Sequence, residues 1–179
     1  MINWLFEWLF FCSLTQQSVL EELVSLVVTE PSIDVNEKVR FKYANLACEI
    51  LTSDVAAIND ALVSNEDLLN KLYNFIENQN CLNPLLASFF SKTVGMLFSK
   101  RTEKMFEFLK TKDFINSLVK HIETSAIMDL LLKLYIHVDT NDSRTTVANV
   151  RQHDQVFDFV NLTLLFAVAT FKQSSWSIG

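Results

Sequence analysis

Apolar residues recur along the chain at intervals of three and four, and polar residues separate one apolar group from the next. This spacing places apolar side chains on one face of an α-helix, so it predicts a succession of amphipathic helices. Residues 127–138 are apolar nearly all round, which is typical of a helix buried on several sides. The predicted helical segments are 19–28, 39–51, 58–62, 68–76, 85–97, 105–109, 114–122 and 127–138.

The segment boundaries carry helix start signals. Asn83 precedes Pro84, which places a good N-cap before a proline in the first turn. Residues 64–67 (Ser-Asn-Glu-Asp) resemble a capping box for segment 68–76. Thr102 and Asp113 are candidate caps for segments 105–109 and 114–122, and Thr124 or Ser125 is the candidate for segment 127–138. These signals divide the chain into helices of about 10–17 residues joined by short links.

The periodicity also predicts which side chains are buried. In segment 39–51 the expected inner face is formed by Val39, Tyr43, Leu46, Ala47, Ile50 and Leu51. In the later segments the expected core residues are Leu86, Phe89, Phe90, Leu97, Leu118, Ile127, Leu130, Leu131 and Leu134.

Composition supports an all-α fold. The chain has 179 residues, half of them hydrophobic, but only 2 Gly and 2 Pro. An all-β fold would lack the glycines that its turns need, and the phosphate-binding loops of nucleotide enzymes would lack theirs. Short links between paired helices suggest an α-solenoid or an irregular bundle. Because no repeat of fixed period is visible, we expect a HEAT- or armadillo-like solenoid fragment of antiparallel helix pairs rather than a tetratricopeptide or ankyrin array.

Charge and cysteine usage limit the partners and the compartment. The net charge is −6, and residues 1–37 contain six acidic and no basic residues. Acidic and basic residues are therefore equal in number over the rest of the chain. A chain with no basic excess is not expected to bind nucleic acid. Its three cysteines (Cys12, Cys48 and Cys81) are scattered and form no C-x-x-C pair, which favours a reducing compartment. We therefore expect a cytoplasmic protein, with the nucleus as a second location.

Two apolar runs lie near the ends of the chain, at Ile2–Leu14 and Phe159–Phe171. Both are shorter than the ~20 residues of a spanning helix, and Glu7 stands where a signal peptide needs positive charge. We expect buried helices; a membrane-associated protein anchored by these runs is the alternative. The first run is predicted to contact the first helices through Trp4, Leu5, Trp8, Leu9 and Phe10. The second is predicted to lie near Leu131 and Leu134 through Phe157, Val160, Leu164 and Val168. An apolar patch is expected to stay exposed.

Candidate chemistry is sparse. The three histidines, at 121, 137 and 153, have no second ligand at helical spacing, and no nucleophile motif is present. We therefore expect no enzyme, no metal and no cofactor. A local basic excess within residues 92–120 could meet an acidic partner, although the solvated face of two helices would look the same. The candidate partner-binding residues are Lys92, Lys100, Arg101, Lys104, Lys110 and Lys112.

Three strings are more distinctive than any of these features. They are CEILTSDV at 48–55 followed by Ile58-Asn59-Asp60, LNPLLASFFSK at 82–92, and His121-Ile122 followed by TSAIMDLLL at 124–132. In this order and spacing they resemble the SAPS-domain family, the regulatory subunits of protein phosphatase 6, a type-2A-like serine/threonine phosphatase. The resemblance runs from about residue 20 to about residue 138.

The resemblance implies a non-catalytic helical-repeat domain that binds the phosphatase catalytic subunit, together with further scaffold subunits, and directs the enzyme to substrates. It divides the chain into a divergent apolar segment at 1–14, a partial SAPS-like helical domain at 15–138, and a divergent tail at 139–179 with one apolar helix. The family domain is much longer than this chain, so a truncated isoform without phosphatase binding is the alternative.

Overall fold

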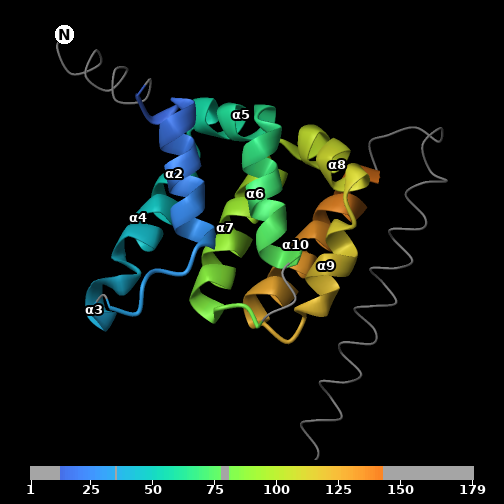
Figure 1. Cartoon of the computed structure of the whole chain (residues 1–179). Coiled ribbons are helices and arrows are strands. Elements are labelled where there is room, and N and C mark those ends of the chain that lie inside the picture. Colours follow the sequence, from blue (N-terminus) through green and yellow to red (C-terminus); the bar gives the residue numbers. More distant parts are fainter. Residues whose placement is uncertain (1–12, 35, 78–80, 143–179) are drawn as a thin grey trace, which may run out of the picture.

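The protein is described by a computed structural model over residues 13–34, 36–77 and 81–142 (Figure 1). All the regular elements in these ranges are α-helices, which confirms the predicted all-α class for the described part of the chain. The helices are α2 (Gln17–Val28), α3 (Glu37–Arg40), α4 (Lys42–Leu51), α5 (Ala56–Ser64), α6 (Glu66–Glu77), α7 (Pro84–Lys100), α8 (Thr102–Thr111), α9 (Phe114–Lys120) and α10 (Ser125–Asp142).

The main helices form two layers (Figure 1). One layer contains α2, α6 and α9 in that order, and the other contains α4, α7 and α10. The chain runs in opposite directions in the two layers, so α2 forms an antiparallel pair with α4, and α9 with α10. Helices α5 and α8 lie across one end of these pairs. The two layers meet on their apolar faces, so the core lies between them.

The same order of helices occurs twice along the chain. A short helix of 9 or 10 residues (α5, α8) is followed by a helix of the first layer and then by a long helix of 17 or 18 residues (α7, α10). Such a recurrence without sequence identity is what a degenerate helical repeat would give. The finer description as a HEAT- or armadillo-like solenoid fragment stays a prediction.

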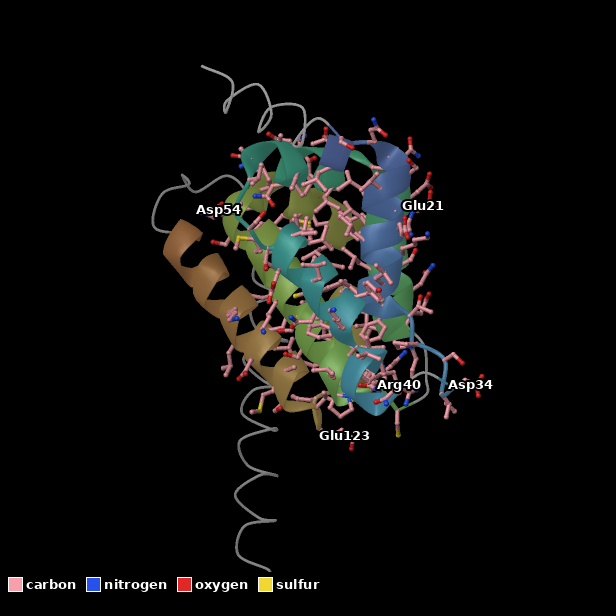
Figure 2. The ribbon with its side chains drawn as sticks, turned by 90° about the vertical axis from the view of Figure 1, so that its left-hand side faces the viewer. Glu21, Asp34, Arg40, Asp54 and Glu123 are labelled. Atoms are coloured by element: carbon pink, nitrogen blue, oxygen red, sulfur yellow. The ribbon has the colours of Figure 1, made fainter. Side chains whose placement is uncertain are left out.

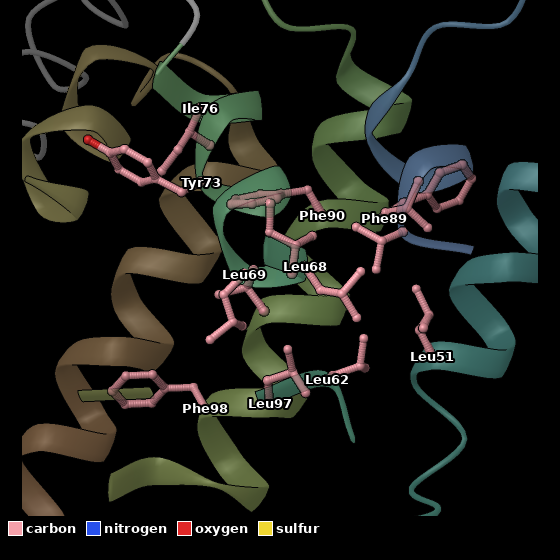
Figure 3. Close-up of a cluster of buried hydrophobic side chains, with 14 of the residues drawn as sticks. Leu51, Leu62, Leu68, Leu69, Tyr73, Ile76, Phe89, Phe90, Leu97 and Phe98 are labelled. Carbon is pink, nitrogen blue, oxygen red and sulfur yellow. The ribbon is translucent and has the colours of Figure 1, made fainter. Parts of the chain in front are cut away.

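Helix α7 is the centre of the array. It packs against α2, α4, α5, α8 and α10. Phe89 and Phe90 are both buried, and the Phe90 ring lies 5.2 Å from the ring of Phe75 on α6. Figure 3 shows these side chains meeting leucines of α4, α5 and α6. All nine predicted core residues of the later segments are buried, so that prediction is confirmed.

The predicted inner face of segment 39–51 is only partly right: Ala47 and Leu51 are buried and Ile50 is half-buried, but the other three residues are exposed. The segment is two helices, α3 and α4, and α4 turns Ala44, Ala47, Cys48 and Leu51 inward. Val39, Tyr43 and Leu46 are 46%, 66% and 50% exposed. Two apolar stripes of helical spacing coexist here, and the stripe with the smaller side chains is the buried one. Small residues at a helix contact shorten the distance between helix axes, which suits the close pairing of α4 with α2.

Two of the predicted helix starts are confirmed in substance. The Asn83 side-chain oxygen accepts from the backbone N–H groups of Leu85 and Leu86 at 3.0 and 3.4 Å, with Pro84 as the first residue of α7. Asn65 caps α6 in the same way, accepting from Asp67 and Leu68 at 3.1 and 3.4 Å. The cap is thus the asparagine of the 64–67 string rather than its serine.

The predicted side-chain caps at Thr102 and Asp113 do not form, although Asp113 lies at the N-cap position of α9. The Thr102 hydroxyl donates 2.7 Å back to the carbonyl oxygen of Phe98, four residues earlier. The Asp113 carboxylate accepts from the side-chain amide of Asn116. Polar side chains with a second local partner are diverted from the backbone N–H groups that a cap would satisfy.

The terminal apolar runs fall largely outside the described residues, and so do the predicted contacts of residues 4–10 and 157–168. Leu14, at the end of the first run, is described and packs against the core. No helix in the described ranges is long and apolar enough to cross a membrane.

We predict that Phe89→Ala lowers the free energy of unfolding by about 3–5 kcal/mol, because it removes a fully packed ring from the most connected helix. Leu85→Ala is the matched control on α7, since Leu85 is 43% exposed; we expect it to cost less than about 1 kcal/mol. Urea denaturation of both variants measures the difference. A loss below about 1 kcal/mol for Phe89→Ala would contradict the described core.

We predict that Gly95→Ala stabilises the protein by up to about 1 kcal/mol, the difference in helix propensity between the two residues. Gly95 lies inside α7, and an added Cβ would lie 3.8 Å from side-chain atoms of Leu130 and Lys133, an ordinary van der Waals distance. Thermal or urea unfolding measures the gain. Destabilisation would show that α7 and α10 approach more closely than the structure describes.

Candidate protein-protein interface

Three of the six candidate partner-binding residues meet at one end of the array. Lys100 is the last residue of α7, Arg101 joins α7 to α8, and Lys104 lies in the first turn of α8. The turn after α4 and the helix α5 lie beside this junction. Each of the three basic residues has a hydrogen-bond partner on that neighbouring segment, so the junction ties two parts of the chain about 40 residues apart.

Arg101 makes the most specific of these contacts. Its Nε and Nη2 donate to the two carboxylate oxygens of Asp60 at 2.5 and 2.9 Å, a bidentate pair. Nη1 donates 2.8 Å to the carbonyl oxygen of Lys100, which fixes the guanidinium plane. The hydrogen bonds from Arg101 lower the pKa of the Asp60 carboxyl below its ordinary 3.8, and the same pair raises the pKa of Arg101.

Asp54 and Ser64 complete the tie. Lys100 Nζ lies 2.6 Å from Asp54 Oδ2, and Lys104 Nζ donates to Ser64 Oγ at 3.1 Å. Asp54 has a φ of 60°, in the left-handed region that aspartate tolerates better than most residues. The strained turn directs its carboxylate toward the end of α7, where a positive charge also complements the helix dipole.

The other three candidates lie elsewhere. Lys92 is exposed on α7, about two turns before Lys100. Lys110 is exposed in the last turn of α8, and Lys112 follows that helix with its ammonium 5.7 Å from the centre of the Tyr73 ring. The six residues therefore do not form one patch. Four of them are engaged with the chain itself, and Lys92 and Lys110 are the exposed members that remain available to a partner.

The acidic excess of the first part of the chain is also partly balanced in the fold. Glu21 lies 2.9 Å from Lys71 of α6, and Glu30 lies 3.3 Å from Arg40. Arg40 additionally donates to the Pro31 carbonyl oxygen and lies against the ring of Phe41. Figure 2 shows Glu21 on α2. It also shows Arg40 and Asp34 near each other, toward the end of the array opposite to Asp54.

The reactive side chains in the interior are held by structural contacts. Burial raises the pKa of the Cys48 thiol, which lies 3.8 Å from the Phe89 carbonyl oxygen. His121 is buried, and its Nε2 lies 2.9 Å from the carbonyl oxygen of Ile76. Within the described ranges, no group of three or more histidine, cysteine and acidic residues is placed to hold a metal ion.

Sequence reasoning did not identify Asp54 and Asp60 as partners of the basic cluster. Each acid precedes its partner by more than 40 residues, and no local pattern links positions so far apart. The one available signal was that both acids belong to the string at 48–60, whose polar residues stand between two apolar segments.

We predict that Asp60→Asn lowers stability near neutral pH and reduces its dependence on pH. Because the folded pKa of Asp60 lies below 3.8, its stabilising contribution is complete above pH 3.8 and is lost as the pH falls toward the folded pKa. The difference in unfolding free energy between the two proteins should therefore shrink below pH 3.8 and in high salt. Asp67→Asn, another aspartate exposed at the start of α6, is the control; an equal effect there would show that the pair with Arg101 is not responsible.

Comparison with known proteins places this fold in a family. A family model described as SAPS, SIT4 phosphatase-associated protein, matches residues 94–165. The match begins in α7, includes α8 to α10, and continues beyond residue 138, where the motif resemblance ended. The boundaries drawn at residues 14 and 138 stay predictions.

The relatives in sequence are phosphatase regulatory subunits. Over 144 residues the chain is 51% identical to serine/threonine-protein phosphatase 6 regulatory subunit 2 of Homo sapiens and 49% identical to regulatory subunit 3 of Gallus gallus. These matches cover 80% of this chain but only 15% and 16% of the two relatives.

A more distant relative is the extragenic suppressor of kinetochore protein 1 of Schizosaccharomyces pombe, 38% identical over 76% of this chain and 17% of its own length. The chain thus spans about one sixth of the length of the curated relatives it matches. No solved structure matches it. The family model includes the string at 121–132, the phosphatase 6 regulatory subunits are about half identical over 144 residues, and the chain belongs to the SAPS family of phosphatase-associated proteins.

Proposed function

We propose that the chain is a non-catalytic regulatory or scaffold subunit that binds the catalytic subunit of a phosphatase 6-type serine/threonine phosphatase and directs it to substrates. The observation that carries the proposal is an identity of about one half to phosphatase 6 regulatory subunits over 80% of the chain. At this identity we expect the chain to share its core and most of its surface with the matching part of those subunits.

The fold supports a binding role. Two layers of antiparallel helices give each layer an outer face made of the exposed sides of three helices, and such faces are the binding surfaces of helical-repeat proteins. On the outer face of the second layer, α7 and α10 expose Lys92 and Lys133. The ion pairs at Asp54 and Asp60 hold the segment after α4 against the end of α7, so a partner would meet a preformed surface there.

Binding can be tested with the folded chain and a purified phosphatase 6 catalytic subunit. We expect a complex in pull-down, and we expect the double variant Lys92→Glu/Lys110→Glu to weaken it by about tenfold, equivalent to 1.4 kcal/mol. Surface plasmon resonance at two salt concentrations measures both effects. Lys42→Glu is the matched control, because Lys42 is equally exposed but lies on α4, outside the basic cluster.

The outcomes separate the two parts of the proposal. Binding that is unaffected by the double variant would leave the regulatory function standing and would exclude Lys92 and Lys110 from the interface. No binding by a chain with normal helical circular dichroism would overturn the function itself, as expected of an isoform that does not bind phosphatase.

A further inference from the structure

Two polar contacts join α5 to the start of α8, one beside the other. Asp60 and Ser64 are four residues apart on α5, and both are exposed. Arg101 and Lys104 are three residues apart at the start of α8. Side chains three or four residues apart lie on one face of a helix, so the two contacts form consecutive rungs. The first rung is the ion pair of Asp60 with Arg101, and the second joins Ser64 Oγ to Lys104 Nζ at 3.1 Å.

The second rung has a charge on one side only. A serine hydroxyl is neutral, and none of the ion pairs among the described residues involves Lys104. The hydrogen bonds of Arg101 lower the pKa of the Asp60 carboxyl most, and the charges of Arg101 and Lys104 add to that effect. The ammonium of Lys104 thus acts on the carboxylate of the neighbouring rung, whereas its own partner is uncharged.

The fold does not use the Ser64 hydroxyl as a helix cap. Asn65 caps α6, because its side-chain oxygen accepts from the backbone N–H groups of the first turn. Glu66 and Asp67 follow two and three residues after Ser64, and all three side chains are exposed. A serine followed by exposed carboxylates suits a protein kinase whose substrate pocket is basic, because the two surfaces are electrostatically complementary.

We propose that Ser64 is a phosphorylation site whose phosphate completes the second rung by pairing with Lys104. In the reaction the Ser64 oxygen bonds to the γ-phosphorus of ATP held by the kinase, the bond from that phosphorus to the β,γ-bridging oxygen breaks, and ADP leaves. The hydroxyl proton passes to the catalytic base of the kinase. The product carries a charge of about −1.5 to −2 near neutral pH and offers phosphate oxygens to the Lys104 ammonium.

Attraction exceeds repulsion at this position. The phosphate adds negative charge one helical turn after Asp60 and close to Glu66 and Asp67. The Asp60 carboxylate is already paired with Arg101, and the other two acids are exposed, so water and salt screen their repulsion. A direct contact between an ammonium and a phosphate is a charge-assisted hydrogen bond and is stronger than the hydroxyl contact it replaces. Phosphorylation therefore tightens the tie between α5 and α8.

Phosphoserine placed at position 64 during translation of the full chain tests this pairing without a kinase. We expect the melting temperature to rise by about 2–4 °C and the gain to shrink in high salt. In a Lys104→Gln background at least half of the gain should be lost. Lys110→Gln is the matched control, because Lys110 is another exposed lysine of α8 and its loss should leave the gain intact. No rise, or a rise that Lys104→Gln leaves unchanged, would overturn the proposal.

Acceptance by a kinase is measured on the folded full chain with MgATP and a serine kinase that selects an acidic residue three positions after the serine. Mass mapping should find phosphate at Ser64, none at this position in Ser64→Ala, and at least tenfold less in Glu66→Gln/Asp67→Asn. Phosphorylation of a peptide of residues 58–70, but not of the folded chain, would show that the fold hides the serine and would overturn the proposal. None of these readings depends on phosphatase binding.

Discussion

The packing of α7 against helices of both layers is the constraint from which the rest of the array follows. This helix contributes nine buried residues and contacts helices of both layers. A helix buried on several sides cannot carry a continuous polar face, so the pairs α2–α4 and α9–α10 must cover it from either flank. Helix α10 passes beside Gly95 of α7, near the buried Leu130, with room left for a Cβ. The order of the whole array is thus set by what one 17-residue helix needs to bury.

Sequence patterns predicted this central region well and its edge poorly. Around α7 and α10 one apolar set dominates each segment, and the Asn83-Pro84 start has a local physical cause. On α4 two apolar sets compete, and only the partner helix decides which is buried. A single-helix periodicity cannot contain that information, because it depends on which side of α4 meets its neighbouring helices α2 and α7. Three residues that the pattern placed inside, Val39, Tyr43 and Leu46, are exposed as a result.

The candidate interface, too, could be predicted from the sequence only in part. The basic residues at 92–112 could be found by counting charge, but the acids that engage two of them could not. Asp54 and Asp60 reach Lys100 and Arg101 only because the turn after α4 is folded against the end of α7. A charge count therefore overestimates the positive surface offered to a partner. What remains, around Lys92 and Lys110, is small enough that shape and apolar contacts would have to supply most of a partner's affinity.

The opposite chain directions in the two layers have an electrostatic consequence. Peptide dipoles add along each helix, leaving partial positive charge at its first turn and partial negative charge at its last. At the end of the array that carries α5 and α8, the starts of α6 and α9 lie beside the ends of α4, α7 and α10. Their partial charges oppose one another, so the backbone contributes little net field at either end. The long-range attraction that this protein exerts on an approaching molecule must therefore come from its side chains.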